Sequence, residues 1–388
     1  MNLTTEFDQH LPESAQALLR TAHEFGQRHL QQDTADLSDS VRRDLLRLAI
    51  RAGLASMEVP IEHGGPGLTF ATRMRVCETL ANFDGAFAFS LVNHHNIMSR
   101  IARLGTEALR ADVLRAMLAG DQIGCTAMTE PQSGSDFANM QTMATRTSDG
   151  WLLTGEKAWI TNAALADVLL VYAQTDPTQG IGGIAGFVVK ATTPGFERLP
   201  AYDAKFTRGT EVGGFALKDC FVADSHVLYP APQGFKAAMS GVNQARIHVA
   251  ALNTGLVDSA LQTALNYARE RNAFGVDLLS HQGIGWSLAD VATQLQAMRL
   301  LLYQATRAVE SSQSSSEDVQ MVAAMAKKFS NDHALQAIAQ CMQAMGAEGL
   351  RDRYVLARHL ACARALCYTD GTPEMMNERI RVLLRKSS

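Results

Sequence analysis

The chain has 388 residues, of which 47% are apolar and 19% charged, and 35 Lys and Arg against 39 Asp and Glu give a formal net charge of -4. This length and balance are typical of a globular protein with two or three cooperating domains. The chain lacks the strongly basic character expected of a protein that binds nucleic acid or an anionic membrane surface.

The cysteines and the N-terminus bear on the compartment. The six cysteines form no CxxC pair and no zinc-ligand spacing, so we expect reduced, mostly buried thiols and no bound metal. The N-terminus has no basic segment followed by an apolar one, and no apolar run approaches about 18 residues. We therefore expect a cytoplasmic protein without a membrane span.

Residues 1–121 are predicted to form a helical domain. Apolar residues recur at helical spacing, as in Leu18, Ala22 and Phe25. The glycine- and proline-rich stretch VPIEHGGPGL interrupts this pattern and predicts a tight loop between short helices.

Residues 122–230 are predicted to form a small antiparallel β domain. The runs WLLTGEKAWI, DVLLVYAQT and IAGFVVKA are strand-like, and the turn clusters TSDG, DPTQGIGG and TTPG separate the predicted strands. Nothing in this segment has the alternating strands and helices of a doubly wound sheet.

Residues 231–388 return to helical spacing over long stretches. The runs AALNTGLVDSALQTALNYARERNAF and LADVATQLQAMRLLLYQATRAVE predict long antiparallel helices of a bundle. The low-complexity patch SSQSSSED is predicted to be the loop between two of them.

Two candidate motifs favour structural interpretations. Gly180, Gly182 and Ala185 match a loose dinucleotide fingerprint, but a β run follows them where that fingerprint requires a helix, so we expect a hairpin connection. His94 and His95 lack a carboxylate partner at ligand spacing, so we expect a histidine pair on a helix rather than a metal site.

Three stretches carry groups suited to a flat, anionic cofactor, although each alone is more often structural. MTEPQSGSD places Thr129 and Gly134 in a loop with open backbone N–H groups that could hold a phosphate or a flavin edge. GEKAWITN offers Trp159 for packing on a flat ring. ARERNAFG and the SHQ that follows offer Arg271 and Gln282 as contacts for an anion and a ring edge.

The stretch CYTDGTPEMM contains Asp370 in an Asp-Gly turn followed by a helix. Thr372 is predicted to be the N-cap and Pro373 the first helical residue, with an apolar stripe that begins at Met376. Taken alone, this stretch is a turn and a helix start, and Asp370 has no further role.

Together and in this order, these stretches resemble the acyl-CoA dehydrogenase family of flavoproteins. The resemblance extends through EHGGPGL, AMTEPQSGSD, GEKAWITNA, RGTEVGGFALKDCFV, ARIHVAALNTGL, YARERNAFG, HQ, MQAMGAEGL and DGTPEM. It implies an α+β fold with an N-terminal helical domain, a middle antiparallel β-barrel-like domain and a C-terminal four-helix bundle. It also implies FAD as the cofactor, between the β domain and the bundle.

The resemblance implies contacts to the cofactor and the substrate. The expected FAD contacts are Thr126, Met128, Thr129, Gly134, Ser135, Trp159, Thr161, Arg271, Phe274, Gln282, Gln343, Gly346, Thr372 and Glu374. The expected substrate contacts are Ser135, Asn243, Arg246 and Gly371. In this family the adenine and pyrophosphate end is often held across a subunit interface, so the resemblance implies a homodimer or homotetramer.

The family's catalytic glutamate, in the motif YEGT, corresponds to Asp370. Such enzymes remove an α proton from an acyl thioester with a carboxylate while the β hydride passes to flavin N5, and electrons then leave to an electron-transfer flavoprotein or another acceptor. A carboxylate is a weak base for a carbon acid, so the resemblance implies a dry pocket and donors at the thioester carbonyl.

The sequence also departs from the family pattern. Aspartate is one methylene shorter than glutamate, Ala245 occupies the alternative base position of isovaleryl-type members, and Glu374 stands where glutamine is common. The usual Arg-Asp pair before the base is replaced within HLACARAL. These departures favour an unusual substrate or a carrier-protein-linked role, and they leave the acyl group and its carrier open.

Two alternatives to a dehydrogenase remain from the sequence. One is a flavin-dependent oxidase or monooxygenase on the same scaffold, in which the retained carboxylate disfavours a pure monooxygenase. The other is a non-catalytic FAD-binding assembly protein, which the shortened acid and the missing Arg-Asp pair would suit.

Overall fold

The computed structural model describes residues 7–31, 37–202 and 209–386. Contacts divide the chain into two compact units. The helical unit contains the described parts of Met1–Gln32, Phe70–Ala88 and Val242–Ser388. The sheet unit contains the described parts of Asp33–Thr69 and Phe89–Gly241.

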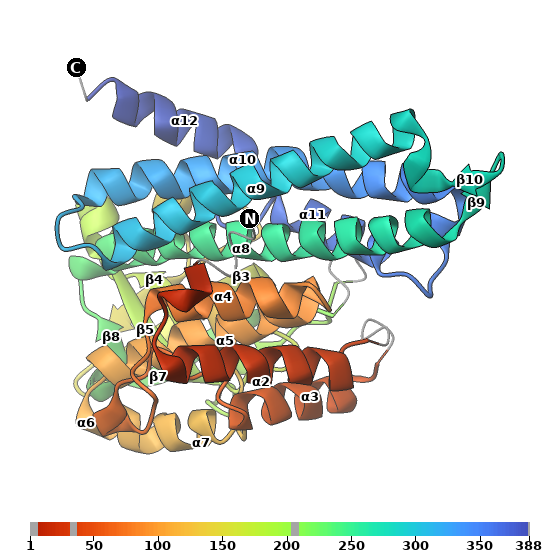
Figure 1. Ribbon diagram of the computed structural model, residues 1–388. Helices are drawn as coiled ribbons and strands as arrows, with labels where there is room; N and C mark the ends of the chain where they lie inside the picture. The colour runs from red at the N-terminus through yellow and green to blue at the C-terminus, as the bar shows by residue number, and fades with distance from the viewer. Residues whose placement is uncertain (1–6, 32–36, 203–208, 387–388) are drawn as a thin grey trace. The chain divides into compact units, whose positions relative to one another are not determined.

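The helical unit is built mainly from long helices joined by short connections. Its elements are α2 (Glu13–His29), α4 (Phe70–Ala81), most of α8 (Gln233–Glu270), β9 (Asn272–Ala273), β10 (Val276–Asp277), α9 (Gln282–Glu310), α10 (Ser316–Met345), α11 (Leu356–Leu366) and α12 (Pro373–Leu384). Helices α9 and α10 pack against each other as an antiparallel pair (Figure 1). This arrangement confirms the predicted bundle.

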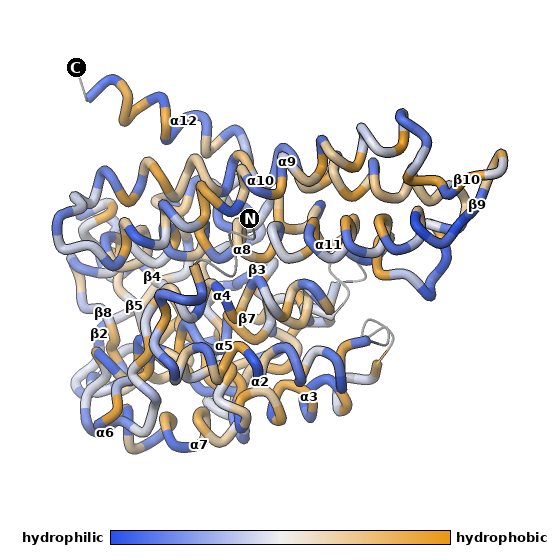
Figure 2. Tube along the Cα trace, viewed as in Figure 1, coloured by the Kyte–Doolittle hydropathy of each residue, from blue (hydrophilic) through white to orange (hydrophobic). Residues whose placement is uncertain are grey.

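Side-chain caps explain where two of these helices begin. Ser315 and Asp318 form a reciprocal capping box at the start of α10, so the helix already begins inside the predicted SSQSSSED loop. Thr372 accepts from the backbone N–H of Met375 and Pro373 opens α12, as the sequence predicts. Apolar and polar segments alternate along α12 (Figure 2), and Met376 is buried.

The sheet unit combines a large sheet with shorter helices. Its helices are α3 (Asp39–Arg51), most of α5 (Gly85–Leu104), α6 (Glu107–Leu109) and α7 (Arg115–Leu118). Its strands are β1 (Gly124–Ala127), β2 (Met143–Arg146), β3 (Gly150–Ile160), β4 (Val168–Gln174), β5 (Ile184–Lys190), β6 (Phe196–Arg198), β7 (Gly213–Ala223) and β8 (Val227–Tyr229). No helix in the described part of the chain is long and apolar enough to cross a membrane.

The eight strands form one sheet in the order β6-β7-β3-β2-β4-β5-β8, with β1 also paired to β4. Most neighbours are antiparallel, but β1 and β2 each pair with β4 in parallel, so the sheet is mixed rather than purely antiparallel as predicted. The local alternation of apolar and polar residues predicts strands, but it does not reveal these parallel pairings because the paired strands are distant in sequence. The glycine-rich stretch Pro177–Gly183 connects the antiparallel strands β4 and β5, which confirms the predicted hairpin connection.

Strand β4 is buried on both faces and contributes to two cores. Val168, Leu170 and Tyr172 pack in a cluster with apolar residues of α5. The alternate residues Leu169 and Val171 pack in a second cluster with apolar residues of β3, β5 and β7. The two-residue period of a strand therefore places a core on each side of the sheet.

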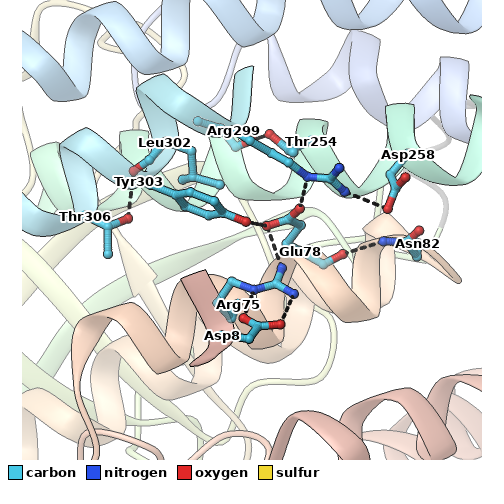
Figure 3. Close-up of polar contacts among 11 residues, drawn as sticks. Asp8, Arg75, Glu78, Asn82, Thr254, Asp258, Arg299, Leu302, Tyr303 and Thr306 are labelled. Atoms are coloured by element: carbon cyan, nitrogen blue, oxygen red, sulfur yellow. Dashed lines mark hydrogen bonds and ion pairs between the residues drawn. The ribbon is translucent and has the colours of Figure 1, made fainter. Parts of the chain in front are cut away.

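A buried ionic network ties α4, α8 and α9 together (Figure 3). The Glu78 carboxylate accepts from Arg75 Nη1 at 2.6 Å and from Arg299 Nε at 3.0 Å. Arg75 also donates to Asp8 at 2.6 Å, and Arg299 donates to Asp258 at 2.7 Å. Burial opposes ionisation of Glu78, but the two guanidinium groups outweigh it and lower the pKa of this carboxyl.

We predict that Glu78→Gln lowers the free energy of unfolding by about 3 to 5 kcal/mol, because removing one member of a buried ionic group leaves its partners uncompensated. Urea unfolding at neutral pH measures the loss. The matched control is Glu317→Gln, since Glu317 pairs with Lys386 at 2.8 Å on the surface and is 55% exposed. Equal effects of the two substitutions would contradict a structural role for the network.

Candidate active site

Asp370 lies in a tight turn of the helical unit, between α11 and α12. Its backbone is in the left-handed region, with φ 53°, and Gly371 follows with φ 97°. A Cβ added at Gly371 would lie 2.9 Å from Met376 Cε, which is the end of a flexible side chain, so it is the positive φ that favours glycine there. The predicted turn is therefore confirmed, and it presents a carboxylate that is 22% exposed.

Two buried cations bind the backbone of this turn. Arg246 Nε donates to the Asp370 carbonyl oxygen at 3.2 Å, and Arg246 Nη1 donates to Asn243 Oδ1 at 2.9 Å. Lys327 Nζ, from α10, donates to the Gly371 carbonyl oxygen at 2.7 Å. These bonds fix the main chain of the turn and so position Asp370.

The surroundings of Arg246 and Lys327 strongly lower the pKa of each side chain. Burial lowers the pKa of Arg246 to about 10, although attraction to Asp370 opposes the shift. Burial likewise lowers the pKa of Lys327 to about 8, again opposed by Asp370. A lysine titrating near this value is unusual, and such perturbed groups cluster at functional sites.

A histidine completes the group around Asp370. His248 lies on α8, is buried, and has Nε2 3.7 Å from Asp370 Oδ2. The sequence predicts Asn243, Arg246, Asp370 and Gly371 for this site, and the structure brings them together. Sequence reasoning misses His248 and Lys327, because no local spacing links α8 and α10 to a turn that follows α11.

In the sheet unit, a buried ion pair organises the predicted MTEPQSGSD loop. Lys157 Nζ donates to Glu130 Oε1 at 2.8 Å, and both side chains are almost fully buried. The carboxylate also accepts from the backbone N–H groups of Gln141 at 2.6 Å and Thr142 at 3.0 Å. Burial lowers the pKa of Lys157 to about 8, partly offset by Glu130. This pair joins the loop to β3.

The junction places several predicted cofactor contacts side by side. The backbone N–H of Ala158 donates to the Thr129 carbonyl at 3.0 Å, and Lys157 Nζ donates to the Met128 carbonyl at 3.2 Å. Trp159 follows with φ 58° at a register shift in β3, and its side chain remains 59% exposed. Its ring centroid lies 4.5 Å from that of Tyr202.

Other predicted contacts of the sheet unit are open or lack partners. Gly134 and Ser135 are exposed, and Thr161 is partly buried. A Cβ at Gly134 would meet only Thr129 Cγ2, at 3.9 Å, so the loop leaves room for a close approach. The Thr126 hydroxyl is buried and has no hydrogen-bond partner among the described residues. Such an orphaned group indicates a missing partner.

The remaining predicted contacts lie in the helical unit. Phe274 and Gly275 form the two-residue tip of the β9–β10 hairpin with φ 55° and 88°, and Phe274 is 97% exposed. Because α9 and α10 are antiparallel, the start of α9 and the end of α10 lie at the same end of this unit (Figure 1). Thr372 caps α12. The other residues that are predicted as contacts in this unit are exposed: Arg271, Phe274, Gln282, Gln343, Gly346 and Glu374.

The paired histidines of α5 are structural in this geometry. His94 Nδ1 accepts from the backbone N–H of Gly124 at 2.9 Å, and burial lowers the pKa of His94 to about 3. His95 binds the Ala55 carbonyl through Nδ1 at 2.8 Å and Glu58 through Nε2 at 3.1 Å. Across the described residues, no group of three or more His, Cys, Asp or Glu side chains could hold a metal ion.

Family models match nearly the whole chain. The N-terminal domain model of acyl-CoA dehydrogenases matches residues 12–121, the middle domain model residues 125–220, and the C-terminal domain model residues 232–383. The chain belongs to the acyl-CoA dehydrogenase family. The fold class predicted from the sequence is confirmed, and the chain is an FAD-dependent oxidoreductase of this family.

Relatives with high coverage agree. The chain is 30% identical to a short-chain specific acyl-CoA dehydrogenase of Megasphaera elsdenii, over 95% of this chain and 97% of the relative. It is 32% identical to the short-chain specific mitochondrial acyl-CoA dehydrogenase of Homo sapiens, over 94% of this chain and 88% of the relative. It is 31% identical to an isovaleryl-CoA dehydrogenase of Oryza sativa, over 92% and 87%.

Solved structures of the family have the same fold. Butyryl-CoA dehydrogenase of Megasphaera elsdenii superposes with a TM-score of 0.89 at 28% identity, covering 97% of this chain and 99% of that one. A structure of PigA with FAD and proline gives a TM-score of 0.90 at 26% identity, with 98% and 99% coverage. A chain in a structure of the electron transferring flavoprotein of Acidaminococcus fermentans gives 0.90 at 30% identity, with 97% and 99% coverage.

The residues of the sheet unit fit FAD. The orphaned Thr126 hydroxyl can pair with a polar edge of an acyl-CoA dehydrogenase flavin, and Trp159 offers an exposed aromatic face. The open backbone at Gly134 allows close approach of the cofactor. The donor set is therefore suited to a planar ring with polar edges.

We predict that Glu130→Gln reduces the sensitivity of the fold to acid. Lys157 and the backbone donors lower the pKa of Glu130 in the folded protein against the effect of burial. Its ionisation therefore stabilises the fold fully above the ordinary pKa of 4.5, and this contribution is lost as the pH falls through the lowered value.

Thermal unfolding between neutral pH and about pH 3 tests this expectation. Glu130→Gln should have a lower Tm than the parent protein at neutral pH, and the difference should shrink on acidification. Glu156→Gln is the matched control, since Glu156 is an exposed carboxylate on β3, next to Lys157. A difference that stays constant with pH would contradict the role assigned to Glu130.

Proposed function

We propose that this chain catalyses α,β-dehydrogenation of a short acyl thioester, with Asp370 as the base. The observation that carries the proposal is the turn at Asp370, which two buried cations hold by its carbonyl oxygens while its carboxylate keeps 22% exposure. A base must be held in place but remain accessible to the substrate's α carbon. This turn meets both requirements.

The residues of this chain have distinct roles in the proposed reaction. The Asp370 carboxylate takes the α proton of the substrate and becomes a carboxylic acid. Arg246 and Lys327 keep the turn from moving as that charge is lost. Bound FAD would supply the acceptor for the hydride from the β carbon. Thr126 and Trp159, with the loop at Gly134, are proposed to hold the flavin.

The proposed substrate class rests on the relatives. Short-chain specific enzymes of Megasphaera elsdenii and Homo sapiens are 30% and 32% identical to this chain over more than nine-tenths of its length. A butyryl-CoA dehydrogenase shares its fold. These likenesses support a short acyl group carried by coenzyme A, with an electron-transfer flavoprotein as the proposed electron acceptor and a homo-oligomer as the proposed assembly.

We predict that butyryl-CoA bleaches the flavin absorbance of the FAD-loaded protein under anaerobic conditions. Asp370→Asn should slow bleaching by at least about 100-fold, because an amide cannot accept the α proton. Asp370→Glu restores a carboxylate and should retain more activity than Asp370→Asn, although its longer side chain misplaces the base by about 1 Å. FAD content, measured by absorbance, should be equal in all three proteins.

Three results would count against this proposal. Full bleaching by Asp370→Asn would remove Asp370 as the base. Stoichiometric hydrogen peroxide during aerobic turnover would indicate the oxidase alternative. A panel of short, branched and aryl thioesters that all fail to reduce tightly bound FAD would favour the non-catalytic alternative.

We predict that Thr126→Val separates cofactor binding from stability. The substitution removes a buried hydroxyl that has no partner within the described residues, so the FAD-free protein should be equally stable or more stable. FAD affinity, measured by titration of tryptophan fluorescence, should fall by about tenfold through loss of one hydrogen bond of about 1.4 kcal/mol. Unchanged affinity would remove Thr126 from the FAD site.

A further inference from the structure

His248 is a buried titratable group that directly faces the proposed base. It is 1% exposed on α8, and its Nε2 lies 3.7 Å from Asp370 Oδ2.

Several charged and titratable groups surround His248 and Asp370. Arg246 comes from α8 and Lys327 from α10, and both are attracted to Asp370. Arg379 of α12 repels Arg246, and Cys367, at the end of α11, interacts with Lys327. A further positive charge on an imidazole among these cations is costly, whereas the carboxylate favours it. The charge on His248 is therefore coupled to the charge on Asp370.

We propose that His248 is a positioning residue for Asp370, whose imidazole shares the proton that the carboxylate removes from the substrate. This inference rests on the proposed function and deepens it. The proton leaves the α carbon for an Asp370 carboxyl oxygen, and it can pass from there to the neutral Nε2. The products of that second transfer are an imidazolium and a restored carboxylate, so charge and protons balance.

The separation of the two groups suits such sharing. A distance of 3.7 Å is longer than a hydrogen bond, but a movement of less than about 1 Å brings the atoms within the roughly 2.6–3.2 Å needed. Hydrogen bonds of catalytic groups are often long before substrate binds and shorten in the complex. Sharing also compensates for the weak basicity of a carboxylate that is close to two cations.

The protonation state of His248 then controls the base. An imidazolium would already donate to Asp370 and oppose proton uptake by the carboxylate. A neutral imidazole can instead accept from the protonated carboxyl group. We therefore expect the rate of flavin bleaching to rise with pH through an ionisation that belongs to His248.

A titration by NMR tests the coupling without turnover. In the FAD-loaded protein with ¹³C-labelled histidine, the His248 signal among the eleven histidines is assigned from its loss in His248→Gln, or in His248→Asn if the first variant does not fold. The His248 signal should titrate at lower pH in Asp370→Asn than in the parent protein, because the carboxylate that attracts the imidazolium is gone. Identical titrations in the two proteins would overturn the proposal.

The pH profile of flavin bleaching by butyryl-CoA supplies the second readout. His248→Gln keeps a polar group near Nε2 but cannot titrate, so bleaching should be about tenfold slower and its profile should lack the ionisation. His359→Gln is the matched control, since His359 is also a fully buried helical histidine, and burial lowers its pKa to about 3. The control should keep the ionisation.

The two readouts separate the possible failures. If the ionisation persists in His248→Gln, it does not belong to His248 and the proposal is overturned. If it is lost equally in His359→Gln, the loss is a general structural effect and the proposal is also overturned. If no thioester bleaches the parent protein, the proposed function fails, whereas the NMR titration still decides whether His248 and Asp370 are coupled.

Discussion

The site depends on two buried cations that bind main-chain carbonyl oxygens. Arg246 and Lys327 come from different helices and converge on consecutive carbonyls of the turn at Asp370 and Gly371. Burying a cation is costly unless it finds good partners, so a turn in any other conformation would leave both charges poorly satisfied. The stability of the helical unit and the position of its carboxylate are therefore linked.

The candidate site of the sheet unit also depends on a buried charged side chain. Lys157 is buried against Glu130, and the carboxylate also binds the main chain of the segment that follows the loop. In both units a charged side chain in the core organises irregular backbone beside the groups that are proposed to function. This arrangement lets the loops keep open backbone and exposed rings, such as Trp159, while their ends are fixed.

The sequence predicts features that are local and misses those that are not. Thr372 as the cap of α12 and the strand-like run of β4 follow from spacing over a few residues, and the structure confirms both. The parallel pairing of β1 with β4 and the approach of His248 to Asp370 join segments more than 40 residues apart. Periodicity carries no information on such contacts, so physical reasoning from one sequence cannot supply them.

At Asp370, local sequence predicts the backbone conformation but not the proposed role of the side chain. Local chemistry describes an Asp-Gly turn, and the structure agrees with φ values in the left-handed region. The proposed role of the carboxylate rests on its neighbours in space and on the family. The same holds for the proposed FAD contacts of the sheet unit, because the lack of a hydrogen-bond partner for the Thr126 hydroxyl among the described residues is known only from its surroundings in space.

The pairing of β4 has a consequence for the order in which the sheet unit assembles. β4 meets β5 across a short connection, whereas its parallel partner β1 lies some forty residues earlier in the chain. Closing the longer loop costs more entropy and is slower, so the β4–β5 ribbon should exist before β1 adds to it. Both faces of β4 are apolar, so the early ribbon exposes hydrophobic surface that is prone to aggregation until α5 and the remaining strands cover it.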